Sequence, residues 1–528
     1  QRREPDLDFY GHLRPRGQAP SKQALGSSVT DLESKFRLPA GFWRLFIALA
    51  LLNLLGAMDI SIVATALPVV VGEFHQTQNM SFVIVGYSLA VALMVPVYGK
   101  LADKYGSSRL FGWVVAVFLG ASIACGLAVD ILSLTLARVL QGFAGAGLGI
   151  LPLAMLSGLL PERVRPKYLA PLASVWAVAA IGGPVLGGIL TDTLGWRWIF
   201  FINVPIGIVA LILAAGALPK QEKLHTNRLF DVWTWVLFAA TSVLLVTTMR
   251  GFAESIQSVL RQGTLELALG TALVAGLFVW RSVKSNDPVL PLHIFGNRGA
   301  ATILVIGTLG STNLFGISGF VPSALQMGFN IPASLAGLGL VPMVLVMVST
   351  SIITSRRIAK TGKWRHLPII GTSIGTASMT AAYLFSSSAG PWFIVLCLAI
   401  SAFGLGLIGQ LPLILVQAFT KAKVFGAVTA TVNVSRDLTG SVVSTIAGGV
   451  FGWGVVNALT RLNLPEGWNP AALTPLQLSH LDLTTRAAVN SAYVESFQPI
   501  FLNSALAYGF ALLLALTMPK LQLKHATH

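Results

Sequence analysis

Charged residues are scarce in this chain. Only 11% of its 528 residues are Asp, Glu, Lys or Arg, 54% are hydrophobic, and the mean hydropathy is +0.74. A soluble protein carries about a quarter charged residues. The apolar segments are about 20 residues long, enough to cross the hydrocarbon core of a bilayer as helices. This balance excludes an ordinary soluble domain and predicts an all-α membrane protein with many spans.

Metal ligands and disulfide partners are also few. The two cysteines, Cys125 and Cys397, lie in separate apolar segments, and none of the 8 histidines lies deep in a predicted span. These positions argue against a disulfide or a metal site. The sequence has no phosphate-binding GxxxxGK[ST] loop and no evident nucleophile–base set. We therefore expect no enzyme activity, no metal, no cofactor and no ATP-driven cycle.

Acidic residues are outnumbered by basic ones, 20 to 36, which gives a net charge of +16. A basic balance can indicate nucleic acid, but in membrane proteins Lys and Arg collect in cytoplasmic loops. Of the 36, 29 fall on the side of the two termini, 5 fall on the opposite side and 2 lie inside spans. This asymmetry predicts cytoplasmic termini and an even number of spans. We predict fourteen, at 45–71, 81–99, 110–129, 131–159, 168–191, 198–218, 231–249, 264–280, 300–326, 333–353, 366–387, 391–419, 424–454 and 500–518.

Two cytoplasmic loops resemble each other. GKLADKYGSSR (99–109) follows the second predicted span and SRRIAKTGKWR (355–365) follows the tenth, with the same spacing to Gly106 and Gly362. A repeat eight spans apart fits two six-span bundles around a two-span insert, with a binding site between the halves. The predicted organisation is a disordered cytoplasmic tail (1–42), an N-terminal bundle (43–218), an insert with linkers (219–299), a C-terminal bundle (300–518) with an outside loop (455–499, at most one short helix near 476–493), and a cytoplasmic tail (519–528).

Two charges lie within apolar runs, Asp59 in MDISIVATALP and Arg138 in LTLARVLQGFAGAG. Ionisable residues inside a bilayer are costly and usually functional. A carboxyl can change protonation during a cycle, whereas an arginine stays charged. We expect Asp59 to carry a proton and Arg138 to influence it. Gln141, one helical turn beyond Arg138, would extend the polar path. The alternatives are a plain helix contact or a permanent tether, and the sequence leaves contact between the two charges open.

Weaker candidates lie elsewhere in the predicted spans. Arg436 and Asp437 form a second pair of charges, which we expect to point to different sides of their helix without pairing with each other. Asp437 is a candidate second proton or cation site. Polar and aromatic residues that could line a cavity, or simply join helices, are Gln141, Trp176, Asn313, Gln326 and Gln417.

Taken in order, these motifs over about residues 44–454 resemble the major facilitator superfamily, and within it the fourteen-span drug:proton antiporters. MDISIVATALP resembles the first-span signature, whose acidic residue is here Asp59, and LTLARVLQGFAGAG resembles the fourth-span motif, whose arginine is Arg138. GWRWIFFINVPIG, DPVLPLHIF and the stretch around Arg436 also resemble this subgroup. The resemblance implies the major facilitator fold.

The resemblance also implies roles for two further motifs. GKLADKYGSSR resembles the loop that gates the cytoplasmic side, through Gly99, Asp103, Gly106 and Arg109. Asp103 is expected to contact Arg109 or a helix N-terminus, although Ser107 and Ser108 replace basic residues usual in the family. IGGPVLGG resembles the antiporter motif of the fifth span, carried by Gly182, Gly183, Pro184, Gly187 and Gly188. Its small residues let helices approach closely, either as a seam against leakage or as ordinary packing.

The resemblance implies a proton-driven exporter of amphipathic or cationic small molecules, as in multidrug efflux and antibiotic resistance. It also implies a monomer in a bacterial plasma (inner) membrane, powered by the proton motive force. Its partners would be a small-molecule or lipid-like substrate, protons and the bilayer, with no nucleic acid. Alternatives are export of an endogenous lipid, peptide or metabolite, sodium as the coupling ion, and a membrane sensor that transports nothing.

Overall fold

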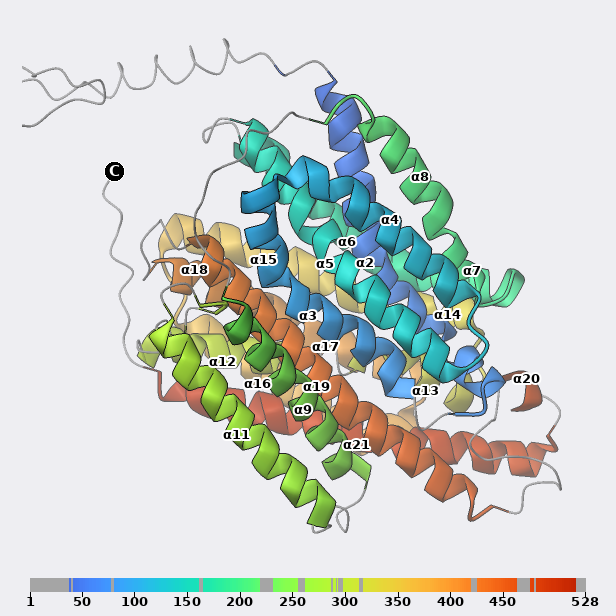
Figure 1. Ribbon diagram of the computed structural model, residues 1–528. Coiled ribbons are helices and arrows are strands. Elements are labelled where there is room, and N and C mark those ends of the chain that lie inside the picture. Colours follow the sequence, from blue (N-terminus) through green and yellow to red (C-terminus); the bar gives the residue numbers. More distant parts are fainter. Residues whose placement is uncertain are drawn as a thin grey trace, which may run out of the picture.

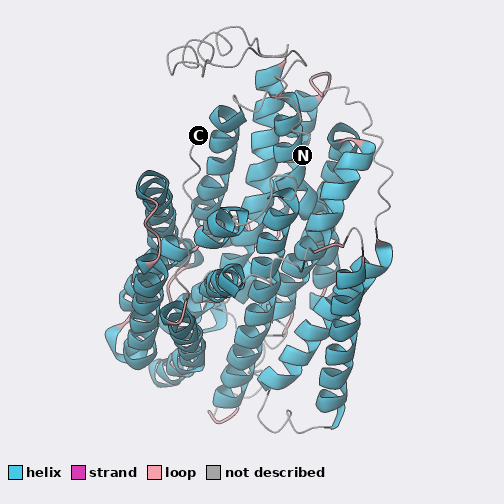
Figure 2. Ribbon diagram, turned by 90° about the vertical axis from the view of Figure 1, so that its left-hand side faces the viewer, coloured by secondary structure: helices cyan, strands magenta, loops and turns pink. Residues whose placement is uncertain are grey.

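The computed structural model describes residues 38, 41–76, 80–160, 165–218, 231–254, 262–285, 288–290, 292, 298–312, 317–418, 425–462, 475–478 and 481–518. Within these ranges the regular structure is helical, and strands are absent (Figure 2). The predicted tails, 1–42 and 519–528, lie largely outside the described residues.

The first half of the chain forms one group of helices, blue to green in Figure 1. The helices of this half are α2 (Phe42–Glu73), α3 (Met80–Tyr105), α4 (Ser107–Gly126), α5 (Ile131–Leu159), α6 (Arg165–Thr193), α7 (Trp198–Phe201) and α8 (Asn203–Ala214). Its last span consists of two short helices, α7 and α8, separated by the single residue Ile202, whose own backbone is helical.

The second half forms another group, joined to the first through two insert helices, α9 (Val232–Glu254) and α11 (Gln262–Lys284). Several of its predicted spans are again made of two helical pieces. Its helices are α12 (Arg298–Thr312), α13 (Val321–Phe329), α14 (Ala333–Leu338), α15 (Val341–Thr361), α16 (His366–Ala389), α17 (Pro391–Ile408), α18 (Leu411–Ala418), α19 (Phe425–Leu459), α20 (Pro475–Leu478) and α21 (Leu483–Leu516).

Ten helices of the described residues are long and apolar enough to cross a membrane, and two shorter apolar helices, 178–193 and 198–214, accompany them. The chain is therefore a multi-pass membrane protein, as its composition predicts. The total of fourteen spans and the cytoplasmic placement of the termini stay predictions.

The last helix differs from the prediction. α21 is continuous over 34 residues from Leu483, so part of the predicted outside loop is helical. Asp482 caps the N-terminus of this helix, and its side chain accepts a hydrogen bond from the Thr485 amide at 3.0 Å. At 1.5 Å per residue the helix is about 51 Å long, well beyond a hydrocarbon core of about 30 Å. Hydropathy detects only the apolar part of such a helix.

The two similar loops both have a glycine at positive φ, but the chain leaves the two glycines in different directions, with ψ 135° at Gly106 and −1° at Gly362. Gly106 (φ 83°) lies between α3 and α4, and Gly362 (φ 64°) follows α15 directly. The Gly106 amide donates to the Ala102 carbonyl at 3.0 Å, and the Gly362 amide donates to the Ile358 carbonyl at 2.8 Å. Glycine adopts positive φ without a Cβ clash. The repeated glycine thus closes the last turn of a helix in each half.

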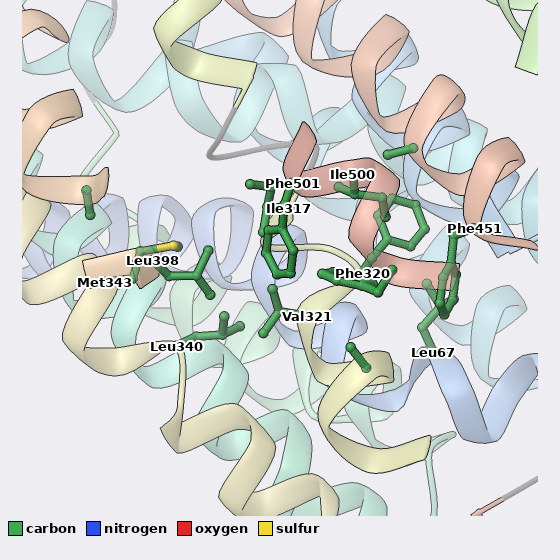
Figure 3. Close-up of a cluster of buried hydrophobic side chains, with 14 of the residues drawn as sticks. Leu67, Ile317, Phe320, Val321, Leu340, Met343, Leu398, Phe451, Ile500 and Phe501 are labelled. Atoms are coloured by element: carbon green, nitrogen blue, oxygen red, sulfur yellow. The ribbon is translucent and has the colours of Figure 1, made fainter. Parts of the chain in front are cut away.

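An apolar cluster joins the halves. Leu67 of α2 lies in it with Phe320, just before α13, Phe451 of α19 and Phe501 of α21 (Figure 3). All four side chains are buried.

The insert contacts both halves on one flank. The Trp235 indole of α9 donates to the Leu93 carbonyl of α3 at 2.9 Å. Phe238 of α9 and Phe278 of α11 belong to a small buried cluster that includes Leu93 and Val434 of α19. The insert thus packs against a helix of each half.

Candidate functional site

Asp59 and Arg138, which the sequence singles out, contact each other. Arg138 Nη1 lies 2.5 Å from Asp59 Oδ2, and Nη2 lies 3.5 Å from the Asp59 backbone oxygen. The two residues are 0% and 1% exposed. The question left open by the sequence is answered: α2 and α5 are joined by a buried ion pair.

Three further polar side chains complete this centre. Gln141 Nε2 and Asn203 Nδ2 both donate to Asp59 Oδ1, at 2.9 and 3.2 Å. The same two nitrogens also donate to Ser122 Oγ, at 3.2 and 2.9 Å. Gln141 Oε1 accepts from Arg138 Nη1 at 2.7 Å, as expected for a residue one turn along α5. We call these five residues, from α2, α4, α5 and α8, the carboxylate centre.

Close packing of α3 on α5 shapes the guanidinium side of the centre. The Arg138 Cζ lies 4.1 Å from the centroid of the Tyr87 ring, and cations bind favourably over aromatic faces. A Cβ at Gly142 would lie 2.9 Å from the Ala90 Cβ, and one at Gly145 would lie 3.1 Å from Tyr87 Cζ. Glycines in LTLARVLQGFAGAG thus bring Tyr87 against Arg138.

A capping box begins α5, the helix that carries Arg138. Asp130 and Ser133 form a capping box at the start of α5, with the Ser133 amide donating to Asp130 Oδ1 at 2.6 Å. Hydrogen bonds from Ser133 hold the pKa of Asp130 below its ordinary value. Arg138 is seven residues after Ile131, so the centre lies about 10 Å from this end of α5.

GWRWIFFINVPIG supplies the rest of the centre. Its residue Asn203 is the first of α8. The Phe200 carbonyl accepts from Ser122 Oγ at 2.9 Å. Trp196 Nε1 donates to Glu73 Oε2 at 2.6 Å, and Arg197 pairs with Glu73 Oε1 at 2.8 Å. The motif therefore closes the carboxylate centre and ties it to the end of α2.

The glycines of IGGPVLGG face different neighbouring helices. A Cβ at Gly187 would lie 2.9 Å from Ile62 Cγ1, and one at Gly183 would lie 3.2 Å from the Met58 carbonyl, so both pack on α2. One at Gly188 would lie 2.6 Å from the Ser334 Cα of α14. Gly182 faces nothing within 4 Å.

Contacts between the halves gather at this end of α6. A Cβ at Gly337 of α14 would lie 2.7 Å from the Pro184 carbonyl carbon. The Ser334 amide donates to Asp192 Oδ2 at 2.9 Å. Gln326 of α13, 2% exposed, donates to the Thr65 carbonyl of α2 at 2.8 Å. We call this region, where α13 and α14 meet α2 and α6, the interhalf seam.

Other predicted residues lie apart from the centre. Arg436 Nε is 3.4 Å from Asp437 Oδ1, so the expectation that these neighbours do not pair is wrong: long side chains can bend toward each other along a helix surface. Trp176 is 38% exposed on α6, and Arg109 is exposed at the start of α4. A Cβ at Gly99 would meet nothing within 4 Å. Asn313 and the side chains of Asp103 and Gln417 lie outside the described residues.

Sequence reasoning missed Asn203, Ser122 and Tyr87. Asn203 could have been found as a polar residue inside the apolar run of GWRWIFFINVPIG. Ser122 and Tyr87 give no such signal, because a lone serine or tyrosine is common in a span. Among the described residues no group of three or more His, Cys, Asp or Glu is placed to hold a metal ion.

Comparison with known proteins places the chain among transporters. Residues 49–444 match the family described as Major Facilitator Superfamily. An uncharacterized MFS-type transporter of Mycobacterium tuberculosis is 30% identical over 489 residues, covering 89% of this chain and 69% of that protein. The multidrug transporter protein MdtP of Bacillus subtilis is 30% identical over 414 residues, covering 78% and 75%.

A solved structure shares the fold. It is a bacterial homolog of the human lysosomal transporter Spinster in an inward-facing, occupied conformation, with a TM-score of 0.63 at 15% identity, covering 89% of this chain and 95% of that one. With three quarters of its length matched to one family, this chain is a membrane transporter, not an enzyme, and belongs to the Major Facilitator Superfamily.

Proposed function

We propose that this transporter is a proton-coupled antiporter of the fourteen-span type, which exports amphipathic or cationic small molecules from the cytoplasm. The observation that carries the proposal is the carboxylate centre: one carboxyl, Asp59, buried beside a permanently charged Arg138. Intramembrane ionisable residues of this kind mark ion pathways and proton relays. The similarity to MdtP, named a multidrug transporter, favours multidrug efflux.

The structure suggests how protonation would reach the transport pathway. Asp59 and the residues that pack on the antiporter glycines, from Met58 to Thr65, lie on the same stretch of α2. Thr65 is six residues beyond Asp59, about 9 Å along the helix, and its carbonyl binds Gln326 across the interhalf seam. Protonation of Asp59 would weaken its contact with Arg138, and α2 would transmit this change to the interhalf seam.

The orientation predicted from Lys and Arg gives this movement a direction. With cytoplasmic termini, the seam would lie on the outside, and its contacts would close the transporter to the outside. In the proposed cycle Asp59 takes up a proton in the outward-facing form, which favours substrate release there, and the halves then rock to the inward-facing form. Proton loss to the cytoplasm restores the ion pair.

The driving force suffices for useful export. One charge crossing about 100 mV yields about 2.3 kcal/mol, which sustains a gradient of roughly 50-fold at about 1.4 kcal/mol per decade. A stoichiometry of one or two protons therefore supports efflux.

The test is a substrate screen on purified protein in proteoliposomes with an imposed pH gradient, with proton flux recorded in parallel. We expect substrate-dependent proton movement opposite to substrate, and loss of uphill transport in Asp59→Asn. If Asp59→Asn concentrated substrate as well as wild type, Asp59 would not be the coupling residue. Uphill transport driven by a sodium gradient alone would show that sodium, and not the proton, is the coupling ion.

A further inference from the structure

Asn203 has a buried side-chain oxygen without a partner. Its Nδ2 donates to Asp59 Oδ1 at 3.2 Å and to Ser122 Oγ at 2.9 Å, whereas Oδ1 is buried and makes no hydrogen bond. A buried polar atom left unpaired costs about 1–3 kcal/mol. Arg138 Nε of the same centre also lacks a partner, but it is a donor, so Asn203 Oδ1 is the buried unpaired acceptor that calls for an explanation.

The donors around Asp59 match a carboxylate and not an acid. Arg138, Gln141 and Asn203 all donate to its oxygens. A protonated carboxyl carries an O–H that needs an acceptor. Gln141 Oε1 already accepts from Arg138 at 2.7 Å and from the Cys125 thiol at 3.4 Å. Among the side chains bonded to Asp59, the free acceptor is Asn203 Oδ1.

We propose that Asn203 is a positioning residue whose side-chain amide turns over when Asp59 takes up a proton. In the turned form Oδ1 occupies the present place of Nδ2 and accepts the hydrogen bond from the Asp59 O–H. The inference rests on the proposed function, because it assumes that Asp59 is protonated during the cycle. The proton comes from solvent, and no other bond is made or broken.

Ser122 allows this exchange. Its hydroxyl now donates to the Phe200 carbonyl at 2.9 Å and accepts from Asn203 Nδ2. A hydroxyl can donate or accept by rotation, so it can instead donate to the turned Asn203 oxygen. Both orientations of the amide therefore make two hydrogen bonds, and in the turned form the Phe200 carbonyl loses the one that it now accepts from Ser122.

Among the described side chains that hydrogen-bond to Asp59, Arg138 and Gln141 have no free acceptor. The charged or titratable side chains that face Asp59 are Arg138 on α5, which only donates, Cys125 on α4, and Tyr87 on α3, whose ring lies under Arg138. The chain of α6 has no titratable residue between Leu169 and Thr191. Asn203 on α8 is the side chain that can donate to Asp59 as a carboxylate and accept from Asp59 as an acid.

Infrared difference spectroscopy on the full-length protein in lipid, between alkaline and acidic pH, tests this inference. The acid carbonyl band of Asp59 is identified by its loss in Asp59→Asn. In protein labelled with ¹³C at the asparagine carboxamide, we expect an asparagine band that shifts to lower frequency with the midpoint of the Asp59 band. The absence of such a band, with the Asp59 band present, overturns the inference. A spectrum without an Asp59 band overturns the proposed proton site, and this inference with it.

Matched variants give a second measurement. Gln141 and Asn203 donate to the same oxygen, but the Gln141 oxygen is held by Arg138. We expect the Asp59 acid band to move to higher frequency in Asn203→Leu, where the acid loses its acceptor, and to stay in place in Gln141→Leu. Equal shifts in the two variants, or a shift in Gln141→Leu alone, overturn the role of Asn203. The labelled wild type decides the question if Asn203→Leu does not fold.

Discussion

A single methyl group at Gly188 is expected to open the interhalf seam. Gly188 of α6 faces the backbone of α14, where an added Cβ would lie 2.6 Å from both the Ala333 carbonyl carbon and the Ser334 Cα. Backbone atoms cannot turn away as a flexible side chain can. Gly188→Ala therefore forces α6 and α14 apart wherever the two halves are closed at this end.

The size of the effect follows from the cost of overpacking. Forcing an extra carbon into a packed contact costs about 1–3 kcal/mol. A conformation with the seam open does not bear this cost, so the equilibrium shifts toward it by the same amount. That corresponds to roughly a 5- to 150-fold change in the ratio of the two forms.

The matched control lies in the same motif. A Cβ at Gly182 would meet nothing within 4 Å, so Gly182→Ala adds the same methyl group to the same helix without a clash. A pair of spin labels at Leu194 and Leu335, both exposed, reports the distance across the seam. The native Cys125 and Cys397 are buried and do not compete for the label.

We expect Gly188→Ala to enlarge the population with a long Leu194–Leu335 distance, and Gly182→Ala to match wild type. Unchanged distances in Gly188→Ala would refute the assignment of this contact to the seam. A change of equal size in Gly182→Ala would show that helix propensity, and not the contact with α14, moves the equilibrium.

Two further predictions concern stability. Arg138→Met leaves the buried Asp59 charge without its partner and should destabilise the protein by about 3–5 kcal/mol, whereas adding Asp59→Asn should restore most of the loss. Thermal unfolding measures both, and an Arg138→Met protein as stable as wild type would contradict the prediction. Burial alone would raise the pKa of Asp231, at the start of α9, but hydrogen bonds from Thr234 and Ser285 and the contact with Arg281 bring it below its ordinary value. Its stabilisation is therefore complete above the unfolded pKa of about 3.9 and is lost as the pH falls through the lower folded value. Thermal midpoints of wild type and Asp231→Asn should differ at about pH 7 and converge below about pH 4, and a difference independent of pH would contradict the role.

Asp59 and Arg138 could be found from the sequence because a charge in a bilayer is costly wherever the helix faces. Their contact could not be predicted, because it depends on how far each helix is rotated and shifted against its neighbour. Asn203 and Ser122 carry no charge, and such residues often serve only to join helices. Their part in the centre depends on how α4 and α8 are rotated and shifted against α2 and α5.

The IGGPVLGG motif shows the same limit of prediction from sequence. Its glycines are identical letters, yet Gly183 and Gly187 face α2, Gly188 faces α14 and Gly182 faces open space. Helix periodicity indicates which of them share a side, but not which neighbour occupies that side. The beginning of α21 was missed for another reason, since a helix that continues beyond the bilayer loses its hydropathy signal and keeps its hydrogen bonds.

The helix ends at Gly106 and Gly362 are similar in one respect, since both glycine amides close a helical turn at positive φ. Beyond that turn the two backbones differ, with ψ 135° at Gly106 and −1° at Gly362, and the position of Asp103 corresponds to Ala359. An acidic residue in place of Ala359 would lie on the last turn of α15, three residues before Gly362, as Asp103 of α3 lies three residues before Gly106. That change alone would not make the second loop a copy of the first, because the chain leaves Gly362 in a different direction.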